Sequence, residues 1–404
     1  MVGMAARPEH VPESLVVDFD YYNPPGAELD YHEAWAALRS QCPSSLIWTP
    51  RNGGHWIPLE GRLIFEVLAD NENFSTHVVS LPETRGKSQL GIPTTLSPPE
   101  HGKYRALLNH GLSPKAIAGL EPRIRSLAIQ LIEDIAPRGA CEFTTDYAVA
   151  LPLRIFMTLV DLPESDIPTT RRLAEQVTRP DGTMTMAEIM AGFHAYLGPY
   201  LDARRARPGN DMLSYIINAR IDGEEIRRDY AMSLCVQLLI GGMDTVASFL
   251  SFAMLFLARH PDHRRQLVED RSLIPGAVDE LLRRFAIVTL VRTAKKDMTL
   301  RGVSIKAGDH MSIPSVLHGL DEKEYPEPMK VDFRRPVRDY STFGNGVHRC
   351  PGAFLARTEV RITLEEWMGR IPQFEVKAGH DIAMRGGVVG SIVALPLTWR
   401  SEHR

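Results

Sequence analysis

A single cysteine, Cys350, lies between a glycine-rich loop and a predicted helix, in the stretch 341–357 with the sequence STFGNGVHRCPGAFLAR. Gly344 and Gly346 permit positive φ angles and a close approach of the backbone to a flat partner. A cysteine at the start of a helix lies where free N–H groups and the helix dipole favour the thiolate. A thiolate held in this way is a suitable axial ligand for haem iron. An ordinary buried cysteine is the alternative for Cys350.

A second group of residues, GGMDT at 241–245, interrupts the most apolar stretch of the chain. Two glycines inside a helix each cost about 1 kcal/mol relative to alanine, and a buried aspartate costs more unless it has a partner. Residues that disfavour a buried helix in this way are expected at functional sites. The pattern favours a chemical role for the acid–alcohol pair Asp244 and Thr245. The alternative is a small-residue packing point with a satisfied Asp–Thr hydrogen bond.

The helix that carries this pair is predicted to run from Asp229 to Arg259. Its roughly thirty residues would span about 45 Å, enough to cross a whole domain. Residues 234–258 contain one charged residue, Asp244, so a hydropathy window would mark a transmembrane helix. An ionisable residue at the centre of a span is costly, and amphipathic helices surround the segment. We therefore expect a buried central helix and no membrane partner.

The rest of the chain has mainly helical periodicity, notably through residues 99–219 and 263–285. A β-hairpin and further short strands are predicted within the segments 46–57, 287–314 and 373–399. No repeat or linker divides the sequence. We therefore predict a mainly α fold with minor β, made of a flexible N-terminal arm over residues 1–13 and one domain over residues 14–404.

The composition restricts the class of protein. The 404 residues are 44% hydrophobic and 24% charged, which suits a large folded core. The net charge of −4 provides no basic field for nucleic acid. The four cysteines form no CxxC pair and no disulfide framework, which is typical of a reducing compartment. We expect a cytoplasmic protein that binds no nucleic acid.

The cysteine loop matches, without a gap, the haem-binding signature of the cytochrome P450 family, at Phe343, Gly344, Gly346, His348, Cys350 and Gly352. From about residue 45 onward the chain also resembles the bacterial camphor-hydroxylating members of that family. Stretches that carry this likeness include IPTTLSPPEHGKYRAL, RIFMTLVDLPESDIP, GGMDTVASFLSFAM and DELLRRF. The resemblance implies a single P450 domain, with a long central helix crossing the haem and small β-sheets.

The resemblance also implies roles for individual residues. The cofactor would be haem b, with Cys350 as the iron ligand and Phe343 and Gly352 beside it. Thr245 would be the oxygen-activating alcohol and Asp244 the acid that relays protons, tethered by Arg179 in the closed site. The residues that match the binding positions for the haem propionates are Arg105, Arg292 and His348, for which the alternatives are ordinary surface arginines and a capped loop histidine.

A structural group is implied as well. Glu280 and Arg283 lie three residues apart on one predicted helix face, where they can form an ion pair. Alone, such a pair carries little information, because many surface helices contain one. In the family this pair and an arginine of the segment before the cysteine loop lock that loop in place. Arg335 is the candidate for the third member.

The substrate pocket departs from that of the camphor enzymes. Gln89 stands where those enzymes have a tyrosine that binds the substrate ketone, and Gln237 replaces a pocket leucine. By position, the pocket is lined by Gln89, Thr94, Met186, Gln237, Ile240, Gly241, Val288, Val388 and Val389, of which the apolar members could equally be core. The departures argue against camphor and favour a related terpenoid or norisoprenoid of similar or larger size, with one polar handle.

The resemblance thus implies a haem-thiolate monooxygenase that inserts one atom of O2 into a C–H bond of a small apolar substrate. No flavin or iron–sulfur motif is visible, so two electrons would come from a [2Fe-2S] ferredoxin and its NAD(P)H-dependent reductase. One alternative is a haem-thiolate binding or sensing protein without turnover. Another is a cysteine-nucleophile hydrolase using Cys350 and His348, although residues two apart in a loop need not face each other.

Overall fold

The computed structural model describes residues 4–83 and 91–400. Its α-helices are α1 (Tyr31–Gln41), α2 (Gly61–Ala69), α4 (Glu100–Leu112), α5 (Pro114–Ile135), α6 (Ala150–Val160), α7 (Ile167–Thr178), α8 (Met186–Ala206), α9 (Met212–Ile217), α10 (Arg228–Met243), α11 (Thr245–Arg259), α12 (Pro261–Glu269), α13 (Ile274–Arg284), α14 (Ser315–Gly319) and α15 (Ala353–Arg370). Its strands are β1 (Leu46–Thr49), β2 (His55–Pro58), β3 (Phe74–Ser75), β4 (Ala140–Glu142), β5 (Arg220–Ile221), β6 (Glu224–Glu225), β7 (Thr289–Ala294), β8 (Met298–Leu300), β9 (Val303–Ile305), β10 (His310–Pro314), β11 (Glu375–Val376), β12 (Met384–Arg385), β13 (Ser391–Ile392) and β14 (Pro396–Thr398).

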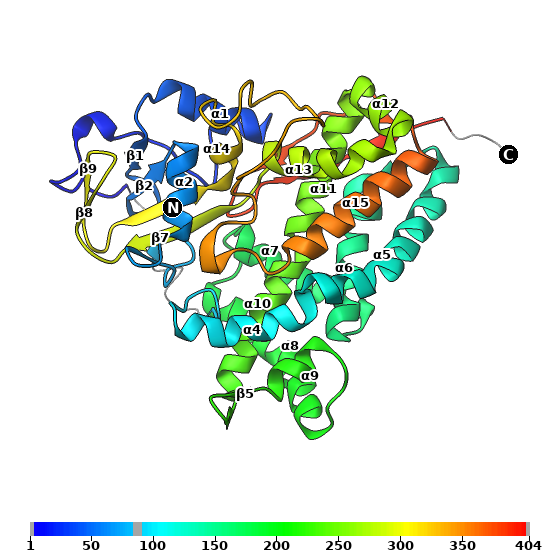
Figure 1. Cartoon of the computed structure of the whole chain (residues 1–404), viewed down its shortest axis with the longest axis horizontal. Coiled ribbons are helices and arrows are strands. Elements are labelled where there is room, and N and C mark those ends of the chain that lie inside the picture. The colour runs from blue at the N-terminus through cyan, green and yellow to red at the C-terminus, as the bar shows by residue number, and fades with distance from the viewer. Residues whose placement is uncertain (1–3, 84–90, 401–404) are drawn as a thin grey trace.

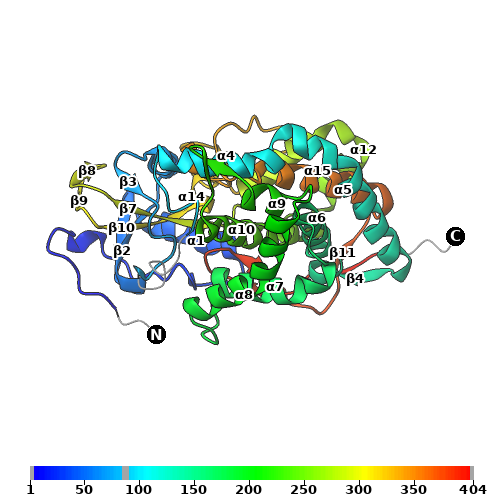
Figure 2. The same cartoon turned by 90° about the horizontal axis from the view of Figure 1, so that it is seen from below.

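The largest sheet lies at one end of the molecule, and most of the helices lie at the other (Figures 1 and 2). Its five strands have the order β1-β2-β10-β7-β3. The predicted hairpin forms its edge, with Leu46 opposite Pro58 and Thr49 opposite His55. The sheet therefore joins the N-terminal quarter of the chain to the segment after α13. The prediction of a mainly α fold with minor β is confirmed.

The described part of the predicted N-terminal arm is in contact with this sheet. The Ala5 N–H donates to the Pro50 carbonyl at 2.8 Å. His10 Nε2 lies 2.8 Å from Asp309 Oδ2, and Val11 is fully buried. The chain is thus attached from Ala5 onward, because an apolar side chain is buried and a backbone hydrogen bond is formed.

The predicted central helix is present, but it is broken at Asp244, whereas the sequence predicts one continuous helix. Helix α10 ends at Met243 and α11 begins at Thr245, with Asp244 between them at φ −136° and ψ −41°. The Thr245 hydroxyl donates to the Gly241 carbonyl at 3.3 Å. A hydroxyl bonded to the carbonyl four residues earlier competes with the backbone ladder and bends a helix. The break therefore comes from the residues of the candidate site.

The helical run Arg228–Arg259 is the one such segment, within the described residues, that is long and apolar enough to cross a membrane. Of its most apolar window, 72% is buried inside the protein. In Figure 1 it passes through the middle of the helical part, between α15 and α7. This burial agrees with the predicted core helix.

Candidate active site

The cysteine loop is held by backbone hydrogen bonds and by one tight helix contact. The Cys350 N–H donates to the Phe343 carbonyl at 2.8 Å, which closes the loop on itself. Gly346 has φ +69°, and a Cβ atom there would lie 2.7 Å from the Cα atom of Ala69 in α2. Glycine is therefore required at 346 on both conformational and steric grounds. Helix α15 begins at Ala353, three residues after the cysteine.

The Cys350 thiol is accessible although much of the surrounding protein packs around it. This burial raises the pKa of the thiol. A backbone hydrogen bond from Gly352, together with Arg105 and Arg349, acts in the opposite direction and lowers this pKa. A coordinated metal ion deprotonates a thiol outright. A metal cation bound to Cys350 would therefore outweigh the effect of burial on the pKa of its thiol.

Four basic side chains gather beside the cysteine loop without an acidic partner. Burial lowers the pKa of Arg292 to about 10 and also lowers the pKa of Arg105. Burial, reinforced by His101, Arg292 and Arg105, lowers the pKa of His348 to about 3. The rings of His101 and His348 lie 4.3 Å apart. Within residues 4–83 and 91–400, no salt bridge joins any of these four side chains to a carboxylate.

This cluster fits an anionic cofactor. The Nε2 atom of His101 is buried and has no hydrogen-bond partner among the described residues. Unpartnered donors and neighbouring cations are costly in a protein interior. Two carboxylates would accept hydrogen bonds from the donors and neutralise the charge of the arginines. Haem b offers this combination of two propionates and an iron. The donor set of one thiol and four cationic or N–H groups therefore matches haem. His101 was not predicted, although its spacing of four residues from Arg105 places both on one face of α4.

Asp244 and Arg179 form a bidentate ion pair at the break in the central helix. Arg179 Nη1 donates to Asp244 Oδ2 at 2.8 Å, and Nη2 donates to Oδ1. The same Nη1 donates to the Val389 carbonyl at 3.2 Å. Both side chains are largely buried. The structure therefore brings the predicted acid and its predicted tether together, at the end of α7.

The two glycines of this helix have different physical roles. A Cβ atom at Gly241 would meet no atom within 4 Å, although the helix around it is buried. Gly241 thus borders an open space inside the protein, and the Thr245 hydroxyl is bonded to its carbonyl. A Cβ atom at Gly242 would lie 2.3 Å from the Phe156 ring. Gly242 is therefore needed for the packing of α6 against α10.

This difference gives a stability prediction. Gly242→Ala is expected to lower the free energy of unfolding by about 1–3 kcal/mol, because the Phe156 ring must move. Gly241→Ala is the matched control. It should leave stability equal or raise it by up to about 1 kcal/mol, since helix propensity improves and no atom is displaced. Denaturant unfolding of both variants measures the difference. Equal stabilities would show that Gly242 is not required for packing.

The remaining pocket candidates lie on separate segments, of which the one with Val389 contacts Arg179, the partner of Asp244. Val288 and Val389 form an antiparallel bridge, and the Thr289 N–H donates to the Val388 carbonyl at 2.9 Å. Gln237 and Ile240 are partly exposed positions of α10. Thr94 is exposed in the loop before α4, and Met186 is the first residue of α8. Gln89 lies outside the described residues.

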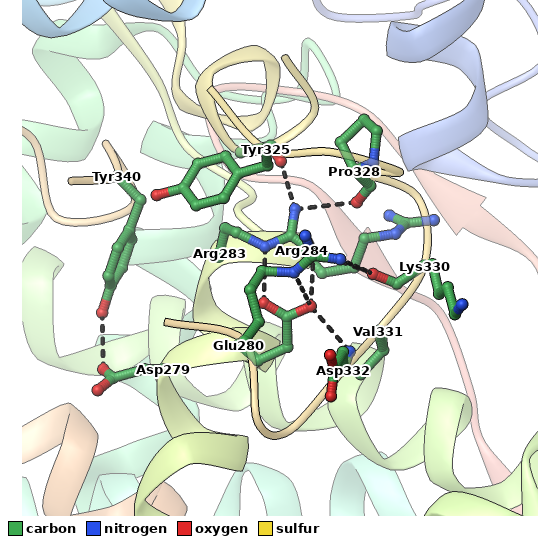
Figure 3. A network of polar contacts seen from close by, with 12 residues as sticks. Asp279, Glu280, Arg283, Arg284, Tyr325, Pro328, Lys330, Val331, Asp332 and Tyr340 are labelled. Carbon is green, nitrogen blue, oxygen red and sulfur yellow. Dashed lines mark hydrogen bonds and ion pairs between the residues drawn. The ribbon is translucent and has the colours of Figure 1, made fainter. Parts of the chain in front are cut away.

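The predicted structural group is assembled in the interior (Figure 3). Arg283 donates from Nε to Glu280 Oε2 at 2.7 Å and from Nη2 to Oε1 at 2.8 Å, and both side chains are fully buried. Arg335 Nε donates to Glu280 Oε1 at 3.0 Å. Arg283 also donates to the carbonyl of Pro328 at 2.9 Å and lies over the ring of Tyr325. One carboxylate thus joins α13 to the segment that leads into the cysteine loop.

An accessible cysteine in a tight loop, a cluster of basic side chains beside it and a buried acid at the break of the central helix are the components of a haem-thiolate type of site. A profile of the family described as Cytochrome P450 matches residues 184–381. The probable cytochrome P450 127A1 of Sinorhizobium fredii is 32% identical over 401 residues, which cover 97% of this chain and 96% of that protein.

Two crystal structures are similar over the whole length. CYP101J2 has a TM-score of 0.90 and 41% identity, and covers 98% of this chain and 100% of its own. CYP101C1 has a TM-score of 0.89 and 40% identity, with the same coverage. The chain belongs to the cytochrome P450 family, whose cofactor is haem b. The predicted resemblance to the bacterial, camphor-hydroxylase-like subfamily is confirmed.

Proposed function

We propose that the protein is a haem-thiolate monooxygenase that hydroxylates a small hydrophobic terpenoid or norisoprenoid. Haem b, when bound, supplies the iron chemistry that activates dioxygen. The single observation that carries the proposal is the accessible but enclosed Cys350 thiol beside four basic groups that lack an acid. Cys350 would hold the iron. Arg105, Arg292, His101 and His348 would hold the two propionates.

Proton delivery is assigned to Thr245 and Asp244. The Thr245 hydroxyl, fixed by the Gly241 carbonyl, is placed to hold a proton at Oγ1 beside the open space. Asp244 is bound by Arg179, so release of this ion pair would free a carboxylate oxygen to pass protons inward. The apolar side chains of Ile240, Val288 and Val388 would hold the substrate. A binding or sensing protein would need no acid–alcohol pair, which favours the enzyme.

Asp244→Asn is expected to slow product formation about 10²- to 10⁴-fold, because a general acid is lost while the shape is kept. The spin-state change on substrate binding should remain, since Asp244 is not a pocket wall. The solvent deuterium isotope effect on turnover should rise, which a merely structural role would not produce. Ser248→Ala is the control, because it removes the hydroxyl that donates to Asp244 Oδ1 at 3.5 Å but keeps the carboxylate itself. Normal turnover in Asp244→Asn would exclude the proton role.

Electrons would arrive from a [2Fe-2S] ferredoxin with its NAD(P)H-dependent reductase. The surface over Cys350 supports this partner, because two apolar side chains flank the cysteine and are exposed, Val347 by 43% and Phe354 by 48%. Arg349 between them is exposed as well. An apolar patch that carries an exposed arginine suits an acidic protein partner. All four cysteines are free, which favours a cytoplasmic location.

The test is turnover of the holoenzyme with a ferredoxin, its reductase, NAD(P)H and a panel of terpenoids and norisoprenoids. The proposal expects hydroxylated products that carry one oxygen atom from labelled O2. Haem binding without oxygenated product under any of these conditions would favour the sensing alternative.

A further inference from the structure

We infer that His318 is a positioning residue of the haem-thiolate site. Its Nδ1 atom fixes the Ser341 hydroxyl at the start of the cysteine loop, and this contact keeps Cys350 in the thiolate form when haem is bound. The inference rests on the proposed function, because it concerns the residue that would hold the iron. It adds a contact from α14 to those that the ion-pair network of Glu280 makes with the preceding segment.

The His318 ring is buried and directs one nitrogen at the cysteine loop. His318 lies on α14 and is fully buried, and its Nδ1 atom is 2.7 Å from Oγ of Ser341, which is 1% exposed. A Cβ atom at Gly61 would lie 2.9 Å from His318 Cδ2. The ring of Phe65, on the same helix as Gly61, has its centroid 5.3 Å from that of His318. Helix α2 therefore packs closely against the ring and holds its orientation toward Ser341.

Helix α14 is itself fixed at its C-terminal end. Arg283 donates a hydrogen bond to the Gly319 carbonyl, and a Cβ atom at Gly319 would lie 2.0 Å from the carbonyl oxygen of Arg283. Two residues beyond the helix, Asp321 Oδ2 accepts the Gly61 N–H at 2.6 Å. His318 is therefore carried by backbone that both α13 and α2 hold in place.

Three hydrogen bonds in series lead from His318 to Cys350. The first is the contact between His318 and the Ser341 hydroxyl. In the second, the Ser341 carbonyl accepts the Gly344 N–H at 2.9 Å, which forms the turn around Phe343. In the third, the Phe343 carbonyl accepts the Cys350 N–H at 2.8 Å. A shift of Ser341 would therefore move the carbonyl that fixes the backbone of the cysteine.

The other nitrogen of His318 shows that this ring is not present for stability. Burial lowers the pKa of His318 to about 4, so the ring is neutral near pH 7. Its Nε2 atom is buried and has no hydrogen-bond partner within the described part of the chain. Such an atom costs about 1–3 kcal/mol, which an apolar ring would avoid. The gain that offsets this cost is the bond from Nδ1 to Ser341.

The consequence for Cys350 is protonation of its sulfur when the loop moves. Burial raises the pKa of the Cys350 thiol, whereas a backbone hydrogen bond from Gly352, together with Arg105 and Arg349, lowers it. A displaced loop loses the groups that favour the thiolate and keeps the effect of burial. The sulfur then takes a proton from water and gives up its bond to the metal, and no electron is transferred.

The experiment follows the reduced holoenzyme under carbon monoxide in a fixed, mild concentration of urea at pH 7. The readout is the rate at which the red-shifted thiolate–CO band converts to the unshifted band of a neutral ligand. His318→Phe keeps the ring but removes the hydrogen bond, and should convert about three- to tenfold faster than the wild type. His318→Asn should convert more slowly than His318→Phe, because its short side-chain amide can replace Nδ1.

Two further variants separate this role from a general loss of stability. Ser341→Ala removes the same hydrogen bond from the side of the loop. It should also convert faster, and the double variant with His318→Phe should be no faster than the faster single variant. His55→Phe is the matched control. His55 is buried in β2, its Nδ1 atom lies 3.2 Å from the Arg51 carbonyl, and its Nε2 atom also lacks a partner.

His55→Phe should keep the wild-type conversion rate, even if it lowers the free energy of unfolding as much as His318→Phe does. An equal acceleration in His55→Phe, or a wild-type rate in His318→Phe, would overturn the inference. If His318→Phe does not fold, a wild-type rate in Ser341→Ala would overturn it instead. The proposed function fails by a different result, a reduced wild-type protein that shows no thiolate–CO band at all.

Discussion

Cys350→Ala is expected to abolish hydroxylation and the thiolate–CO absorption band of the reduced protein. The loss should exceed the ten- to hundredfold effect that is typical when an outer partner of a metal site is removed, because the ligand itself is lost. The physical reason is the geometry of the loop, which leaves this thiol accessible while its N–H is fixed to Phe343 at 2.8 Å.

Cys42→Ala is the matched control for this substitution. Cys42 is a free cysteine that is only partly buried, in the connection after α1, so its loss should change neither the spectrum nor the turnover. Spectra of both variants, recorded at equal haem content, give the comparison. A Cys350→Ala protein that keeps the wild-type band would show that another residue is the ligand.

Arg283→Ala is expected to destabilise the protein by about 3–5 kcal/mol. The substitution leaves the fully buried carboxylate of Glu280 with a single arginine, Arg335, and removes donors to the Pro328 and Gly319 carbonyls. Breaking one partner of a buried ion pair costs this much because the other charge stays in a low-dielectric interior. Since the segment around Pro328 leads into the cysteine loop, haem retention should also fall.

The loss of stability should be large only because the Glu280–Arg283 ion pair is buried. An ion pair on the surface tests this. Arg228 and Asp202 are also ion-paired, but their side chains are 50% and 63% exposed. Arg228→Ala should therefore change the free energy of unfolding by less than about 1 kcal/mol. Chemical denaturation of the holoproteins compares the two. If both substitutions have the same small effect, the buried network does not hold this part of the fold.

The residues that could be predicted from sequence alone are those with local signals. Gly344, Gly346 and Cys350 are close in sequence, so their spacing identifies the loop without knowledge of the fold. The apolar stretch around Asp244 likewise predicts a core helix from composition alone. The Glu280–Arg283 pair has a local spacing too, but its partner Arg335 is 52 residues further on than Arg283, and only the family resemblance could suggest it.

What could not be predicted depends on contacts between distant segments. The reason for Gly242 is the Phe156 ring of another helix, and the reason for Gly91 is the amide of Gln237. His101 joins the basic cluster only because α4 packs beside the cysteine loop. The break at Asp244 arises from a side-chain hydrogen bond of Thr245 that a hydrophobic pattern does not reveal.

The central claim is that Cys350 provides a thiolate to haem iron, and the absorption spectrum of the dithionite-reduced wild-type protein under carbon monoxide tests it most directly. The account predicts a Soret band that is strongly red-shifted, as a thiolate–CO complex requires, with a yield that matches the haem content. An unshifted Soret band in the folded protein, or a folded protein that binds no haem, would contradict it.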